Sequence, residues 1–291
     1  MRKHMIHTIT AITTLAIASL VGCGGGGGSG GASTKTGYFI DSAVGGLEYT
    51  SGSTTGITGA DGSFKYEEGK PVTFKIGSMV LGSVTVTNSR VFPIDLISGA
   101  ADETHPKVSL MAQILQTLDS DGDASNGITI TQSTRQAINQ AIEIAVSDPA
   151  SATDAINQLM NTATSGRAST LISDADAKGH LQTNLLKEYL GTWTGSYTGN
   201  DNGTCNITIG MAAARAGATI AGSCTSSVIS AQQGGVGSID AQFPSSGIFQ
   251  GNLTNGAQFN GNFTRKGTMS GTWVNGNYYG TWTLTKQQSS N

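Results

Sequence analysis

The clearest shortage in this 291-residue sequence is charge, because Asp, Glu, Lys and Arg together make up only 12% of it. The formal net charge is −3, and no cluster of Lys and Arg residues interleaved with aromatic residues occurs. A nucleic-acid-binding domain needs a basic stripe or patch, so we expect no nucleic-acid partner. Low charge with 41 glycines and many Thr, Ser and Asn residues is typical of exported β-rich proteins.

Groups that carry catalysis are also scarce. Four histidines occur, and two of them lie in the N-terminal segment described below. The other two, His105 and His180, have no Ser, Cys or His at a spacing typical of an active site. Outside the glycine-rich run at 24–31, no Gly-x-Ser-x-Gly sequence occurs, and no His-Glu-x-x-His or Walker sequence occurs in the chain. We therefore expect a protein that is not an enzyme and needs no catalytic cofactor.

The N-terminal segment has the pattern of an export signal. Arg2 and Lys3 give a positive start, and the apolar run from 8 to 20 is too short to span a bilayer comfortably. The run ends in Leu20-Val21-Gly22-Cys23, which resembles the lipobox of bacterial lipoproteins. The resemblance implies that residues 1–22 are a signal peptide and that Cys23 becomes the acylated first residue. The alternative is a free cysteine after an ordinary signal, or within an uncleaved anchor.

Residues 23–36 are expected to form a lipidated, glycine-rich tether. Gly-rich coil of this length reaches roughly 20 Å, and membrane lipid would be its partner through acylated Cys23. Gly24 follows Cys23 where an Asp would imply retention at the inner membrane, so the resemblance favours the outer membrane and leaves the leaflet undetermined. The expected location is the cell envelope, with 14 basic and 19 acidic residues in the mature chain.

Two cysteines remain beyond Cys23. An exported chain meets an oxidising compartment, so Cys205 and Cys224 are predicted to form a disulfide. Two buried thiols are the alternative.

Residues 37–103 are predicted to form a β-sandwich-like module of short strands separated by tight turns. Its sequence between Asp41 and Phe64 resembles the prealbumin-like, carboxypeptidase-regulatory type of β-sandwich in bacterial surface proteins, in which such modules are structural or adhesive. We assign turn roles to Asp41 and Asp61. The expected strands are 38–40, 47–49, 63–66, 72–76, 79–81 and 84–86.

Residues 104–189 change to a helical pattern and are predicted to form a helical subdomain packed on the first module. Apolar residues at helical spacing indicate a helix near 108–118 and a second over 132–146. A third is expected to open at Asp148-Pro149, and a fourth at Ser173. The fold class is therefore mainly β with a helical middle, or α+β.

The connection between the first two helices has acidic residues at alternate positions. Asp119, Asp121 and Asp123 are spaced as in calcium loops of the EF-hand or dockerin kind. The pattern departs from that family at Ala124, where glycine is expected, and at Ile130, where a bidentate Glu belongs. A weak calcium site is one interpretation, and a turn-rich solvated connection is the other.

Residues 190–291 are predicted to form a small antiparallel up-and-down β-barrel. Triplets of Gly, a polar residue and an apolar residue recur about every ten residues, which is one strand plus a turn. About eight strands are expected, the number that closes a small barrel. The segment resembles lipocalin- or avidin-like barrels, whose first and last strands pair. The triplets begin at Gly191, Gly251, Gly261, Gly271 and Gly280.

All three tryptophans lie in this segment. Trp193, Trp273 and Trp282 are interpreted either as barrel core or as the lining of a pocket for a lipid or a sugar. The sequence as a whole predicts a membrane-anchored envelope lipoprotein with a structural, adhesive or surface-binding role, whose partner would be an envelope protein, a glycan or a lipid. The alternative is a small-ligand carrier that uses the barrel as its pocket.

Overall fold

The computed structural model describes residues 33–138, 157, 159–212, 217–227, 235 and 237–288. Cys23 and the signal segment lie outside the described residues, as do the opening of the predicted third helix and most of the second. Ala32–Asn291 forms one compact unit, and the predicted division of this unit into modules stays a prediction. Within the described ranges, no helix is both long enough and apolar enough to cross a bilayer.

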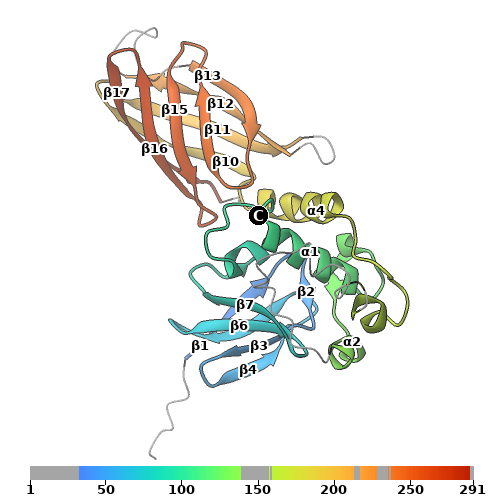
Figure 1. Ribbon diagram of the computed structural model, residues 1–291. Helices are drawn as coiled ribbons and strands as arrows, with labels where there is room; N and C mark the ends of the chain where they lie inside the picture. Colours follow the sequence, from blue (N-terminus) through green and yellow to red (C-terminus); the bar gives the residue numbers. More distant parts are fainter. Residues whose placement is uncertain are drawn as a thin grey trace, which may run out of the picture. The chain divides into compact units, whose positions relative to one another are not determined.

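The first part of the chain folds into sandwich-like β-sheets (Figure 1). A three-stranded sheet has the order β5-β1-β8, and a four-stranded sheet has the order β4-β3-β6-β7. Phe39 and Phe64, from the first sheet, both pack edge-on against Phe74 of the second. The strands are β1 (Thr34–Phe39), β3 (Glu48–Ser51), β4 (Thr54–Ile57), β5 (Ser63–Glu67), β6 (Pro71–Ile76), β7 (Met79–Thr85) and β8 (Arg90–Val91).

The strand prediction for this region divided β7 and missed β4 and the two-residue strands β2 (Val44–Gly45) and β8. The two strands expected at 79–81 and 84–86 are a single strand, β7, which runs through Gly82. Strand β4 was not expected, because its sequence Thr-Thr-Gly-Ile lacks the alternation of a half-buried strand. Antiparallel pairing with β3 holds this segment in a strand conformation that its own sequence does not favour.

Helix α1 (Pro106–Leu118) packs on these sheets and shares their hydrophobic core, whereas Ala177, Leu181 and Leu185 of α4 belong to a separate buried cluster. Leu110, Met111 and Leu115 of α1 belong to the same buried cluster as Phe39 and Phe74. The helix begins as predicted, with the His105 side chain accepting a hydrogen bond from the N–H of Lys107. The elements are η1 (Pro93–Leu96), α1 (Pro106–Leu118), η2 (Ala124–Asn126), α2 (Gln132–Ala137) and α4 (Asp174–Lys187), with β2 (Val44–Gly45) pairing β9 (Ile128–Thr129) in parallel.

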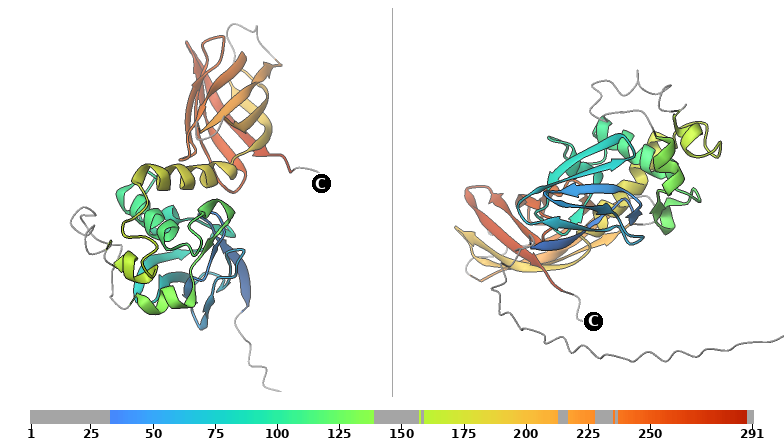
Figure 2. Two further views of the ribbon diagram at one scale, coloured as in Figure 1. Left: turned by 90° about the vertical axis from the view of Figure 1, so that its right-hand side faces the viewer. Right: turned by 90° about the horizontal axis from the view of Figure 1, so that it is seen from below.

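The C-terminal part is an eight-stranded antiparallel sheet that is nearly closed into a barrel, as Figure 2 shows in its left view. Consecutive strands pair with each other except β13 and β14, which lie on either side of the open seam, and the first strand pairs with the last as predicted. Beside the one open seam, the N–H of Thr254 donates to the carbonyl oxygen of Ser238. The strands are β10 (Gly191–Gly199), β11 (Gly203–Met211), β12 (Ala218–Ser226), β13 (Gly237–Phe243), β14 (Ile248–Asn252), β15 (Gln258–Phe263), β16 (Thr268–Asn275) and β17 (Tyr278–Lys286).

Candidate functional site

The barrel interior is the first place to look for a site, and the three tryptophans lie there. Trp193, Trp273 and Trp282 are 0%, 1% and 3% exposed. Each indole N–H donates to a backbone carbonyl oxygen, at 2.8 Å, 3.0 Å and 3.1 Å respectively. Their polar atoms are therefore already satisfied by the protein, and their rings pack against other aromatic rings of the core. This arrangement favours the core interpretation over the ligand-binding one.

The repeating glycines explain how such large rings fit. Gly261 and Gly271 lie opposite each other on β15 and β16, at inward-facing positions of the alternating strands. A Cβ atom built on Gly271 would lie 2.7 Å from the Trp282 ring, and one on Gly261 would overlap the same ring. Each of these two triplets therefore places a glycine and an aromatic residue at successive inward positions of a strand. The space left by each glycine holds the aromatic ring of Trp282 from β17, and such alternation of small and large residues fills a small barrel.

Little free volume is left inside. The cavity lined by the inward side chains of the barrel measures about 30 Å³, whereas pockets for small organic ligands take roughly 300–1,000 Å³. The interior is therefore a packed core.

One buried carboxylate stabilises a turn of the barrel. Asp201, between β10 and β11, is fully buried and accepts hydrogen bonds from the Tyr197 hydroxyl and the Ser226 hydroxyl, both at 2.7 Å. Burial alone would raise the pKa of Asp201, but these hydrogen bonds outweigh it and lower the pKa. Burial and the bond to Asp201 raise the pKa of Tyr197. The Asp201 carboxylate and the Tyr197 and Ser226 hydroxyls are therefore already hydrogen-bonded to one another, which argues against a role in binding a substrate.

The predicted cysteine pair lies where the sequence places it. Cys205 on β11 is directly opposite Cys224 on β12, and the two sulfur atoms are within bonding distance. The bridge closes a loop between residues 19 apart, and a loop of that length stabilises by roughly 3 kcal/mol in the chain-entropy model.

In the acidic loop after α1, the carboxylates accept hydrogen bonds from nearby backbone N–H groups. Asp119 is 1% exposed and accepts from the N–H of Thr129 at 2.8 Å. Asp121 accepts from the N–H of Asp123 and from the Asn126 amide, and these bonds lower its pKa to about 2. Among the described residues, no group of three or more His, Cys, Asp or Glu side chains could hold a metal ion. The calcium site stays a prediction.

A second polar cluster, which was not predicted, joins the turn after β1 to α4. Asp41 is fully buried, and burial raises its pKa to about 7 although the Gln116 amide donates to it at 3.0 Å. The Nε2 atom of His180 lies 3.1 Å from the Ser42 hydroxyl and 3.7 Å from Asp41 Oδ1. A catalytic triad needs its carboxylate on the other ring nitrogen, so this cluster is not a Ser-His-Asp triad.

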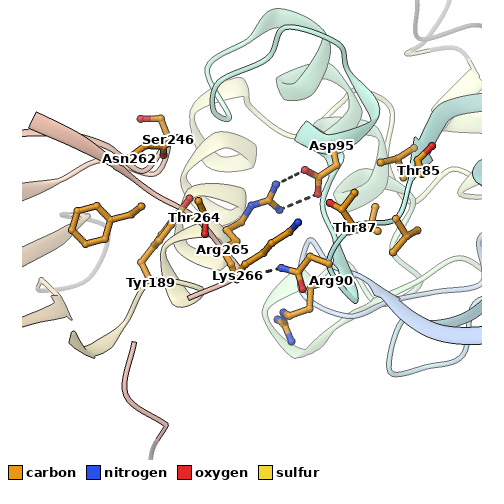
Figure 3. A pocket seen from close by; sticks show the side chains of 15 residues that line it. Thr85, Thr87, Arg90, Asp95, Tyr189, Ser246, Asn262, Thr264, Arg265 and Lys266 are labelled. Atoms are coloured by element: carbon orange, nitrogen blue, oxygen red, sulfur yellow. Dashed lines mark hydrogen bonds and ion pairs between the residues drawn. The ribbon is translucent and has the colours of Figure 1, made fainter. Parts of the chain in front are cut away.

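The surface also carries a pair of adjoining hollows that we call the basic recess. It is lined by segments 84–91, 187–189, 262–267 and 286–288. Figure 3 shows the first hollow, of about 350 Å³, where Arg265 points at Asp95 and Lys266 extends beside it. The second hollow, of about 720 Å³, shares Arg90, Arg265 and Lys266 with the first.

Ion pairs across the recess hold its walls together. Both terminal nitrogens of Arg265, in the β15–β16 turn, donate to the carboxylate of Asp95, and the guanidinium lies 4.9 Å from the ring centroid of Phe92. Arg90 pairs with Glu188 at 2.6 Å. Sequence analysis did not find this recess, because its basic residues come from four separate segments and none of them forms a motif.

Comparison with protein-family models, with curated proteins and with solved structures found no match for this chain.

Proposed function

We propose that this protein is a lipid-anchored component of the bacterial cell envelope, with a non-enzymatic structural, adhesive or surface-binding role. The observation that carries the proposal is the filled barrel, whose interior leaves a cavity of only about 30 Å³. The barrel then acts as a rigid body that presents an outer surface. Its partner would be an envelope protein, a glycan or a lipid.

The same observation weighs against the carrier alternative. A carrier for a lipid or a sugar needs an interior cavity of several hundred cubic ångströms, and it needs polar groups that the empty protein leaves available. In this barrel the indole N–H groups are all bonded to backbone oxygens. The surface-binding role is therefore the better supported of the two.

Support for the anchor comes from the sequence. The charged start, the short apolar run and Leu20-Val21-Gly22-Cys23 together give the lipobox pattern. Several acyl chains, each contributing about 0.8 kcal/mol per buried methylene, would hold the chain at the membrane. The cysteine pair on β11 and β12 fits export to an oxidising compartment. We propose the outer membrane as the location, with no commitment to a leaflet.

Ligand uptake by the barrel can be tested by fluorescence. All three tryptophans of the chain face the barrel interior, so any molecule that enters will change their emission. Using the Cys23→Ala chain to keep acyl groups out of the assay, we expect no saturable change on titration with a long-chain fatty acid or with glucose.

The Phe259→Ala variant provides the positive control. Phe259 lines the small interior cavity, and an engineered apolar cavity can take up benzene, so this variant should respond to benzene while the parent chain does not. A saturable response of the parent chain to the fatty acid or the sugar would establish the carrier function instead.

A further inference from the structure

The basic recess concentrates positive charge in a chain that is acidic overall. Five basic side chains line its two hollows, against two acidic ones, Asp95 and Glu188, which leaves an excess of three positive charges. The chain as a whole has a formal net charge of −3. The basic side chains are Arg90, Lys187, Arg265, Lys266 and Lys286.

Arg90 and Arg265 form ion pairs with the two acidic residues of the recess, Glu188 and Asp95, whereas the three lysines do not. Lys187 donates to the Asn184 side chain at 2.9 Å, and Lys286 donates to the backbone oxygen of Glu188 at 2.9 Å. Within the described part of the chain, Lys187, Lys266 and Lys286 have no carboxylate at ion-pair distance. Their charges are therefore available to an external anion.

Most of the basic residues of the barrel segment lie in the basic recess. Residues 190–291 contain four basic residues, and three of these, Arg265, Lys266 and Lys286, line the recess. Positive groups gathered in a hollow of a low-dielectric protein focus the field and raise the local concentration of anions. A distribution set by solubility alone would spread so few charges over the barrel surface.

The neutral part of the lining indicates a polar ligand larger than a simple ion. Thr85, Thr87, Asn88, Ser246 and Asn262 line the first hollow, and Gln287 and Gln288 line the second. These side chains offer hydrogen-bond donors and acceptors, and the combined hollows are far larger than one oxyanion. Lysines act as point charges that suit phosphate, without the fixed fork by which arginine matches a carboxylate.

We propose that the basic recess binds a phosphate group carried by a larger polar molecule, with Lys187, Lys266 and Lys286 supplying the charge. The phosphate belongs either to a lipid headgroup or to a soluble phosphorylated compound. The inference deepens the proposed surface-binding role and rests on it for its biological meaning. Its test does not involve the acyl anchor, so the two proposals can fail separately.

The test uses the full Cys23→Ala chain and two probes. Calorimetry with sodium pyrophosphate measures binding of a soluble phosphate, and flotation with phosphatidylcholine vesicles, with and without phosphatidic acid, measures binding of a lipid phosphate. We expect saturable binding in at least one arm. Replacing Lys187, Lys266 and Lys286 by Gln should weaken that binding by about tenfold or more, as expected on loss of charge-assisted hydrogen bonds.

The matched control replaces Lys35, Lys65 and Lys70 by Gln, which removes the same charge from exposed positions on and next to β1 and β5 and should leave binding unchanged. Thermal melts check that both variants fold, and Lys266→Gln alone serves if the triple variant does not. Binding of pyrophosphate identifies a soluble source, and binding only to phosphatidic acid vesicles identifies a lipid source. Absence of saturable binding in both arms, or equal weakening by the control, would overturn the proposal.

Discussion

Gly271→Ala is expected to lower the stability of the protein by at least about 3 kcal/mol, because it inserts an atom where the barrel has no room. A Cβ at this position would overlap the backbone oxygen of Asn260 and lie 2.6 Å from the Cα of Gly261. Backbone atoms of a paired strand cannot move aside as a side-chain tip can. The melting temperature should fall by about 6–12 °C, as measured by circular dichroism or calorimetry.

Gly210→Ala is the matched control for this prediction. Gly210 also lies in a barrel strand, β11, but a Cβ added there meets nothing within 4 Å. We expect its melting temperature to stay within a few degrees of the parent or to rise slightly, since alanine reduces the freedom of the unfolded chain. If Gly271→Ala were as stable as Gly210→Ala, the filled-barrel account of the repeat would be wrong.

Asp41→Asn is expected to stabilise the protein at pH 8 and to remove a fall in stability between pH 5 and pH 8. Burial raises the pKa of Asp41 from 3.8 in the unfolded chain to about 7 in the folded one. Between these values the folded state holds a proton that the unfolded state has lost, so stability decreases as the pH rises. The full cost above pH 7 is on the order of 4 kcal/mol.

The groups that face Asp41 support this variant. Gln116 of α1 donates to Oδ2 at 3.0 Å, and an Asn oxygen can accept the same bond. Among the residues that the structure describes, Oδ1 has no hydrogen-bond partner, and it lies 3.7 Å from Nε2 of His180 on α4. The relevant quantity is the difference between the parent and Asp41→Asn at each pH, because every other titratable group is common to the two chains.

Asp61→Asn controls for the loss of a carboxylate as such. Asp61 lies in an exposed turn, where hydrogen bonds from Ser63 lower its pKa, so it stays ionised in both states from pH 5 to pH 8. Denaturant unfolding curves at intervals over this range give the comparison. A parent chain whose stability is constant or rises with pH, with Asp41→Asn following it in parallel, would contradict the buried, neutral Asp41.

Local sequence patterns predicted the helices, strands and pairings that depend on residues close together in the chain. The ten-residue repeat predicted the eight-stranded barrel, because consecutive strands pair at every step except β13 to β14 and the glycine and aromatic positions face the same interior. The start of α4 was also predicted, because Ser173 caps it within four residues by accepting from the N–H of Asp176. Cys205 and Cys224 could be paired because their strands, β11 and β12, are consecutive in the chain and pair antiparallel.

Contacts between distant segments could not be predicted. Asp41 looked like a turn residue, and its contact with His180 joins positions about 140 apart in the chain. The basic recess likewise depends on α4 and two barrel turns meeting the loop before β8, where Asn88 donates to the backbone oxygen of Arg265. Each of its lysines, taken alone in the sequence, resembles an ordinary solvated surface charge.

The most direct test of the proposed function is fractionation of cells that express the full chain or its Cys23→Ala variant during growth with labelled palmitate. The account predicts that the parent chain takes the label and stays with the membrane fraction, while Cys23→Ala takes no label and appears in the soluble periplasmic fraction. An unlabelled parent chain, with a variant that remains membrane-bound, would contradict the lipid-anchored account.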